Sequence, residues 1–246
     1  MCEIIEYKNK YFSILGDSIS TFEGVSLPMD GAFYDVNNKL LSSVFSPLDT
    51  WWGKIVDALG GKVLVNNSIS GSTVIKHPLC EIPSYGCSDE RTSGLSAGGK
   101  TPDVIMVYLG TNDWGMGIKV DDENEVQSLN DCEKKLKIFS VAYRVMINKL
   151  QKFYPNAQIW CLTLPKTYCS CEKGFEFSRA PGGRDIAEYC KAIQTVASDC
   201  GCKIINLFTS EPLCDTLDGF HPTAEGMTAI ANAVLKSLKF SKKPCV

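Results

Sequence analysis

Histidine is scarce in this chain, with only two among 246 residues, against twelve cysteines. A zinc site that mixes cysteine and histidine ligands therefore has few residues to draw on. The closest cysteine pairs, Cys169/Cys171 and Cys200/Cys202, have C-x-C spacing rather than the C-x-x-C of typical zinc sites. We therefore expect no metal and interpret the cysteines as free thiols of a reducing compartment. A thiolate metal site or oxidised pairs are the alternative.

The chain also lacks a strong excess of one charge and long apolar runs. Its formal net charge is −3, which gives no electrostatic footprint for nucleic acid, and no basic run suggests an anionic membrane surface. The longest apolar runs are the length of a strand, which excludes a transmembrane helix. No positive region followed by an apolar run marks a signal peptide. We expect a cytoplasmic protein, unless the leader of a secreted protein has been removed.

The remaining composition is ordinary for a globular protein, with 44% hydrophobic and 22% charged residues. No linker or internal repeat divides the chain, which predicts one domain over residues 1–246. Strand-length apolar runs alternate with helical patterns, which predicts an α/β fold with a parallel sheet and helices on both faces. Strands are expected at Phe12–Leu15, Val63–Asn66, Val104–Leu109, Ile159–Leu162 and Lys203–Leu207, and helices at Leu48–Leu59, Leu129–Phe153, Arg184–Ser198 and Thr223–Leu238.

The first predicted strand stops abruptly at Gly16 and is followed by Asp17 and Ser18. The carboxyl ends of parallel strands form a crevice where ligands and catalytic groups gather. A serine at such an end is held on rigid structure and aimed outward, as a nucleophile must be. The alternative is that Asp17 and Ser18 only cap a following helix, which is a favoured use of both residue types.

Three further segments lie at edges of the same predicted crevice. Gly71 follows the second strand within Asn66–Ser72, Asn112 follows the third within Tyr108–Gly115, and Asp218–Pro222 precedes the last helix. Each segment is weak alone, because short motifs occur often by chance. The prediction of a functional site therefore rests on their occurrence together and in this order.

With these segments the chain resembles the SGNH hydrolase superfamily, also called the GDSL-like lipase/acylhydrolases. The matching blocks span nearly the whole chain and are Gly16-Asp17-Ser18, Gly71, Gly110-x-Asn112-Asp113 and Asp218-x-x-His221. The resemblance implies a flavodoxin-like three-layer α/β/α sandwich around a mostly parallel sheet of about five strands. It also implies hydrolysis of esters, often of small acyl groups on carbohydrates or lipids.

Ester hydrolysis needs a nucleophile, a base for its proton and donors for the oxyanion. Ser18 would attack, His221 would take the proton, and Asp218 would orient His221 and stabilise its cation. The backbone N–H groups of Ser18 and Gly71 and the Asn112 side-chain amide would hold the oxyanion. The other histidine, His77, lies in a loop before a proline, and we interpret it as structural.

Four neighbouring residues have less specific predicted roles. Asp17 is expected to stabilise the turn that presents Ser18 by accepting backbone N–H bonds, and Asp113 to brace Asn112 or cap a helix start. Trp114 would wall an acyl pocket or belong to the plain core. Arg91 would pair with its neighbouring carboxylates or contact a polar substrate.

The favoured function is a metal-independent serine esterase without a cofactor that removes small acyl groups, with a carbohydrate acetyl ester as the first substrate hypothesis. The alternatives are a lysophospholipase or thioesterase, and a non-catalytic carbohydrate-binding protein. The expected partner is a small-molecule or carbohydrate ester, and the oligomeric state is left open. Long loops that contain aromatic residues such as Phe33 are expected to overhang the crevice and shape the substrate pocket. These loops are Thr21–Thr50, Ser72–Pro102 and Pro165–Gly183.

Overall fold

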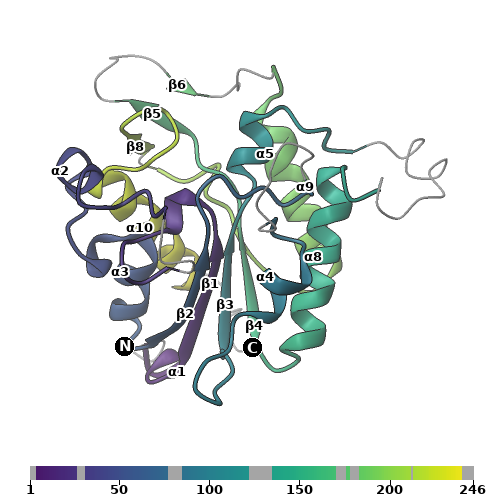
Figure 1. The fold of residues 1–246 in the computed structure, drawn as a ribbon, viewed down its shortest axis with the longest axis horizontal. Helices are drawn as coiled ribbons and strands as arrows, with labels where there is room; N and C mark the ends of the chain where they lie inside the picture. Colours follow the sequence, from purple (N-terminus) through teal and green to yellow (C-terminus); the bar gives the residue numbers. More distant parts are fainter. Residues whose placement is uncertain are drawn as a thin grey trace, which may run out of the picture.

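A five-stranded parallel sheet forms the centre of the computed structural model (Figure 1). The structure describes residues 4–26, 31–76, 85–121, 135–169, 176–177, 183–211 and 213–239. Every strand pair in the sheet is parallel, and the order is that of flavodoxin-like folds. All five predicted strands are confirmed. In sheet order they are β2 (Lys62–Ser68), β1 (Tyr11–Gly16), β3 (Val104–Tyr108), β4 (Gln158–Leu162) and β7 (Lys203–Ile205).

Helices cover both faces of the sheet, which confirms the predicted three layers (Figure 1). On one face, α3 (Trp51–Ala58) packs against α10 (Ala224–Lys239). On the other, α8 (Phe139–Phe153) packs against α9 (Ile186–Asp199) and the short α4 (Asp89–Ser93). Strand β3 is buried over all five residues, because layers on both sides exclude water from a central parallel strand. The other α-helices in the described residues are α1 (Ile4–Tyr7), α2 (Asn38–Ser42) and α5 (Thr111–Gly115).

Two predicted helices have different boundaries in the structure. Of the helix expected over Leu129–Phe153, residues 129–134 lie outside the described residues, and α8 begins at Phe139 after an extended Ile138 with φ −101° and ψ 125°. The first-turn N–H groups of Phe139 and Ser140 donate to the carbonyls of residues 119 and 120, which replaces a side-chain cap. The helix expected over Leu48–Leu59 is divided by an extended Thr50, whose hydroxyl accepts the Gly53 N–H and starts α3.

A second, three-stranded sheet was not predicted. Strand β5 (Thr167–Cys169) pairs in parallel with β8 (Cys214–Thr216) and antiparallel with β6 (Glu176–Phe177). These strands are only two or three residues long, too short to show an alternating pattern in the sequence. Strand β8 leads directly into the Asp218–His221 segment, so this small sheet supports the candidate site.

Other expectations concern side-chain and membrane chemistry. All seven cysteines in the described part of the chain are free thiols. Among the described residues, no His, Cys, Asp and Glu side chains gather in a group of three or more that could hold a metal ion. Over the same ranges, no helix is long and apolar enough to cross a bilayer. His77 lies outside the described residues.

Candidate active site

Ser18 opens a short 3-10 turn, Ser18–Ser20, directly after β1. Gly16 is required before it, because a Cβ there would lie 2.5 Å from the Ser20 hydroxyl oxygen. The Asp17 carboxylate accepts the Ile19 N–H at 3.0 Å and so closes the turn. Ser18 itself is only 8% exposed, and its side chain is therefore held in one place at the end of the strand.

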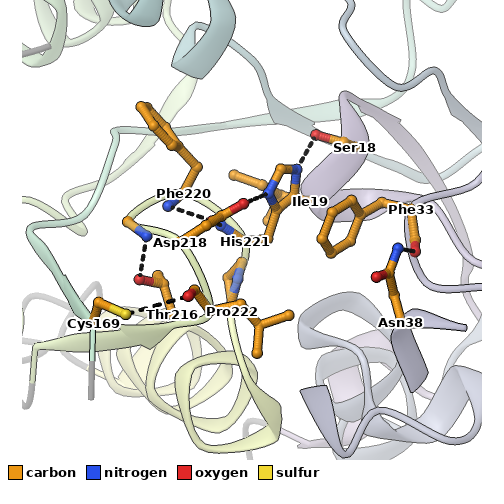
Figure 2. Close-up of polar contacts among 12 residues, drawn as sticks. Ser18, Ile19, Phe33, Asn38, Cys169, Thr216, Asp218, Phe220, His221 and Pro222 are labelled. Carbon is orange, nitrogen blue, oxygen red and sulfur yellow. Dashed lines mark hydrogen bonds and ion pairs between the residues drawn. The ribbon is translucent and has the colours of Figure 1, made fainter. Parts of the chain in front are cut away.

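The structure brings Ser18, His221 and Asp218 together in one chain of hydrogen bonds (Figure 2). His221 Nε2 lies 2.9 Å from Ser18 Oγ, and His221 Nδ1 lies 2.6 Å from Asp218 Oδ2. A carboxylate can only accept, so the histidine proton sits on Nδ1. Nε2 is then free to accept the serine hydroxyl proton, which is the arrangement of a nucleophile and its base.

Asp218 is fixed by its own turn. Its second oxygen, Oδ1, accepts the backbone N–H groups of Phe220 at 3.0 Å and His221 at 2.8 Å. Burial raises the pKa of Asp218, but the bonds from the His221 ring and from these N–H groups outweigh it and lower this pKa to about 2. The side chain is therefore ionised across the neutral range and keeps the histidine in one tautomer. This explains why the two residues stand three positions apart.

The turn that holds Asp218 and His221 is itself anchored to β8. The Leu217 N–H donates to the His221 carbonyl at 2.9 Å, and the Gly219 N–H donates to the Thr216 hydroxyl at 3.0 Å. The Thr167 hydroxyl of β5 donates to the Gly219 carbonyl at 2.7 Å. Strands β5 and β8 therefore fix the position of the histidine turn relative to the main sheet.

Gly71 and Asn112, the other predicted oxyanion donors, follow β2 and β3. Gly71 has φ +74°, a conformation that favours glycine, and a Cβ built there would meet nothing within 4 Å. Asn112 lies in the first turn of α5, and its Nδ2 donates to the Ser72 carbonyl at 3.0 Å. This bond orients the amide beside the Gly71 segment, and an amide nitrogen has a second N–H to offer.

Asp113 is fully buried and joins α5 to the chain that follows Gly71. Its Oδ2 accepts the Val74 N–H at 2.8 Å and its Oδ1 the Ile75 N–H at 3.3 Å. Burial is the main cause that raises the pKa of Asp113 to about 7, and the two N–H groups oppose it. Asp113 therefore braces the Gly71 segment against Asn112.

The raised pKa of Asp113 predicts a dependence of stability on pH. The unfolded chain releases this proton near pH 4 and the folded chain near pH 7, so the unfolded state gains stability as pH rises between them. We expect the free energy of unfolding of the wild type, relative to Asp113→Asn, to fall by up to about 4 kcal/mol from about pH 4 to about pH 7 and then to level. Urea unfolding of both proteins at several pH values measures this difference. A difference that stays constant or rises would contradict the assignment.

Arg91, predicted to pair with its neighbouring carboxylates or to contact a polar substrate, is held among polar groups at the ends of the strands. It is 1% exposed, and its Nη2 donates to the carbonyls of Gly16 and Asn67, both at 2.8 Å. Its Nη1 donates to the Ser72 hydroxyl at 2.8 Å. Burial lowers the pKa of Arg91 to about 10, which still leaves it charged at neutral pH. Arg91 therefore fastens together the ends of β1 and β2 and the residue after Gly71.

Trp114 is also buried, at 2% exposure, and its indole N–H donates to the Arg184 carbonyl at 3.1 Å. Its ring packs on Phe220, with centroids 5.4 Å apart. Both rings line one small cavity, together with Tyr108. Trp114 therefore belongs to the core around the histidine turn, and its role as the wall of an acyl pocket stays a prediction.

Phe33, which the sequence analysis identified only as an aromatic residue of a long loop, lies against His221. The ring of Phe33 is stacked on the imidazole of His221, with centroids 3.5 Å apart and planes 5° from parallel (Figure 2). Phe33 lies in the long segment after β1, and no local spacing connects it with His221. Only the folded chain reveals this contact.

Comparisons with known proteins identify a family for most of the chain. A family model described as GDSL-like Lipase/Acylhydrolase matches residues 10–174. Its range includes Ser18, Gly71 and Asn112 but ends before Asp218 and His221, which the fold brings to the site. No curated protein matches the sequence.

Solved structures resemble the chain over almost its full length. A candidate GDSL-like lipase from Bacteroides uniformis is 26% identical with a TM-score of 0.69, covering 94% of this chain and 96% of that one. A family two carbohydrate esterase from Clostridium thermocellum, solved as an active-site mutant, is 16% identical with a TM-score of 0.58, covering 96% and 64%. A family 2 carbohydrate esterase from Corynascus is 19% identical with a TM-score of 0.56, covering 94% and 66%. The last two likenesses show the fold.

Proposed function

The chain belongs to the GDSL-like lipase/acylhydrolase family, a family of ester hydrolases, and we propose that it hydrolyses small-acyl esters with Ser18 as nucleophile, His221 as base and Asp218 as the group that orients the base. The observation that carries the proposal is the continuous hydrogen-bond chain of 2.9 Å and 2.6 Å through the imidazole. A protein that only binds an ester does not need a serine, a base and a carboxylate joined in one chain of hydrogen bonds.

In the proposed mechanism, Ser18 Oγ attacks the ester carbonyl carbon while His221 Nε2 takes its proton. The carbonyl oxygen becomes an oxyanion, held by the N–H groups of Ser18 and Gly71 and by the Asn112 amide. Collapse of this intermediate breaks the bond to the alcohol, which leaves with the proton from His221. A water molecule, deprotonated by the same nitrogen, then attacks the acyl-serine, and the acid leaves as Ser18 recovers its proton.

A short acyl group on a carbohydrate is the substrate that we propose first. The polar and aromatic residues of the loops around the crevice suit a sugar, and two structural neighbours are described as carbohydrate esterases. Their identity to this chain is below 20%, so they support the hypothesis through shape and not through shared specificity residues.

One experiment tests both the reaction and the acyl length. The wild type is treated with a fluorophosphonate probe, the labelled peptide is identified by mass spectrometry, and rates are measured on p-nitrophenyl esters from acetate to palmitate and on acetylated xylan. We expect the label on Ser18, the highest kcat/KM on the acetyl ester, and unchanged rates after treatment with a chelator. A folded protein with neither label nor turnover would favour the binding-protein alternative.

A second candidate substrate, a long-chain ester or thioester, is favoured by one feature of the surface. The segment after Phe33 presents five large apolar side chains that are each at least 58% exposed, an unusual concentration for one short stretch. They are Val36, Leu40, Leu41, Phe45 and Leu48. A clear preference for the palmitate ester over the acetate in the same series would replace the carbohydrate hypothesis with this one.

The oxyanion role of Asn112 predicts a defined loss of rate. We expect Asn112→Ala to lower kcat about 10²- to 10³-fold with a much smaller change in KM, because the amide would stabilise charge that exists only in the transition state. Asn148→Ala is the matched control, since Asn148 is exposed on α8 and should leave the rate unchanged. An Asn112→Ala variant with the turnover of the wild type would remove this residue from the oxyanion hole.

A further inference from the structure

The stacking of Phe33 on His221 is unusual for two uncharged rings. Aromatic pairs prefer offset or edge-on arrangements, because two π-faces of like sign repel. Here the planes are 5° apart and the centroids 3.5 Å apart, so the rings lie face to face. A cation, in contrast, is attracted to the centre of an aromatic face. A ring stacked in this way therefore stabilises the protonated form of His221 more than the neutral form.

Phe33 is fixed to the nucleophile turn by its backbone. The Thr21 hydroxyl accepts the Phe33 N–H at 2.8 Å and donates to the Ser18 carbonyl at 2.8 Å. The Phe33 carbonyl accepts the Asn38 amide at 2.8 Å, a contact visible beside the histidine in Figure 2. One hydroxyl thus couples the position of the stacked ring to the position of the serine.

The next residue ties the same segment to the histidine turn. Tyr34 is fully buried, and its hydroxyl donates to the carbonyl of Pro222, the neighbour of His221, at 2.8 Å. The Phe33–Tyr34 pair is therefore fastened to both halves of the candidate site, although more than 180 residues separate Tyr34 from Pro222 in the sequence.

Two carboxyl groups in the described elements also interact with the imidazole. Asp218 bonds Nδ1 from its own turn, and the buried Asp17 at the end of β1 interacts with His221 electrostatically. Phe33 adds an uncharged face from the third element packed against the ring. An ionised carboxylate and an aromatic face both favour the imidazolium cation of His221. This cation forms when the histidine takes the serine proton.

From these contacts we propose that Phe33 is a positioning residue that holds the imidazole plane and stabilises the His221 cation; this inference rests on the proposed function. A group that stabilises the cation more than the neutral ring lowers the barrier to proton transfer. Its contribution is expected to fall mainly on kcat and not on KM, because Phe33 acts through His221.

The test replaces Phe33 with leucine, which still covers the ring but has no π-face. From the strength of cation–π contacts, we expect Phe33→Leu to lower kcat for p-nitrophenyl acetate about 2- to 30-fold with little change in KM. We expect Phe33→Tyr to stay within about twofold of the wild type, because it keeps the aromatic face. Thermal melting checks that each variant is folded, and Phe33→Met replaces the leucine variant if that one is not.

A second readout does not depend on turnover. The chain has only two histidines, so the ring signals of His221 can be followed by NMR as pH is varied. In Phe33→Leu the midpoint of the His221 titration should move to lower pH by about 0.4 to 1.5 units. The acid limb of the kcat/KM profile should move by the same amount.

The outcomes separate this inference from the proposed function. An unmoved midpoint in folded Phe33→Leu, or a fall in kcat that Phe33→Tyr does not restore, would overturn the role of Phe33 even if Ser18 is labelled. A wild type that is neither labelled nor active would overturn the proposed function, and the catalytic role of Phe33 with it. In that case a shifted midpoint would still establish the stacked cation.

Discussion

Ser18→Ala should lower kcat for p-nitrophenyl acetate by about 10⁴- to 10⁶-fold, because it removes the only oxygen within hydrogen-bond distance of His221 Nε2 in the described structure. Residual turnover would come from the oxyanion donors and from binding alone. The melting temperature should stay within a few degrees of the wild type, since one partly satisfied hydroxyl contributes only about 1 kcal/mol. Steady-state kinetics and a thermal scan on the same preparation measure both quantities.

The matched control for this variant is Ser20→Ala, in the same turn. The Ser20 hydroxyl accepts the indole N–H of Trp51 at 3.2 Å and does not contact the histidine. We expect the Ser20→Ala variant to keep the fluorophosphonate label and most of the wild-type activity, whereas Ser18→Ala loses both. Labelling that persists in Ser18→Ala would show that another residue is the nucleophile and would contradict the proposed mechanism.

The fold was predictable because its signals are local. Strands β1 and β3 are short apolar runs that end at Gly16 and before Gly110, and a parallel sheet buried on both faces requires such runs. The start of α8 was not predictable in the same way. Its first N–H groups are satisfied by the carbonyls of residues 119 and 120, and a cap supplied by a distant part of the backbone leaves no residue signature.

In the candidate site too, residues with a local role were predictable from the sequence, and residues that act across the fold were not. The spacing of Asp218 and His221 follows from one side chain that both closes a turn and bonds the imidazole, so the sequence contains the signal. Arg91 and Phe33 act across the fold, and Arg91 lies 75 residues from the Gly16 carbonyl to which it donates. A single sequence does not show such pairs, because either residue type is ordinary in its own segment.

Asp218→Asn should lower kcat by about 10⁴-fold while the protein stays folded. Asp218 Oδ1 accepts two backbone N–H groups and Oδ2 accepts the imidazole Nδ1–H. Asparagine has only one acceptor oxygen, and the two N–H groups of the turn retain it, so the amide NH₂ faces the ring. The histidine must then place its proton on Nε2, and this tautomer cannot accept the proton of Ser18.

The size of this loss in kcat shows whether Asp218 acts by orienting the His221 imidazole or only through its negative charge. Asp199→Asn makes the same chemical change at an exposed residue that pairs with Arg144 and should leave kcat unchanged. If Asp218 supplied only diffuse negative charge, its neutral replacement would cost about tenfold or less, because the charge of a half-exposed side chain is screened by water. Because the pKa of Asp218 is about 2, the wild-type carboxylate stays ionised throughout an assay range from pH 6 to pH 8. A deficit of less than tenfold would mean that the tautomer of His221 is set by another group, and the assignment of Asp218 would fall.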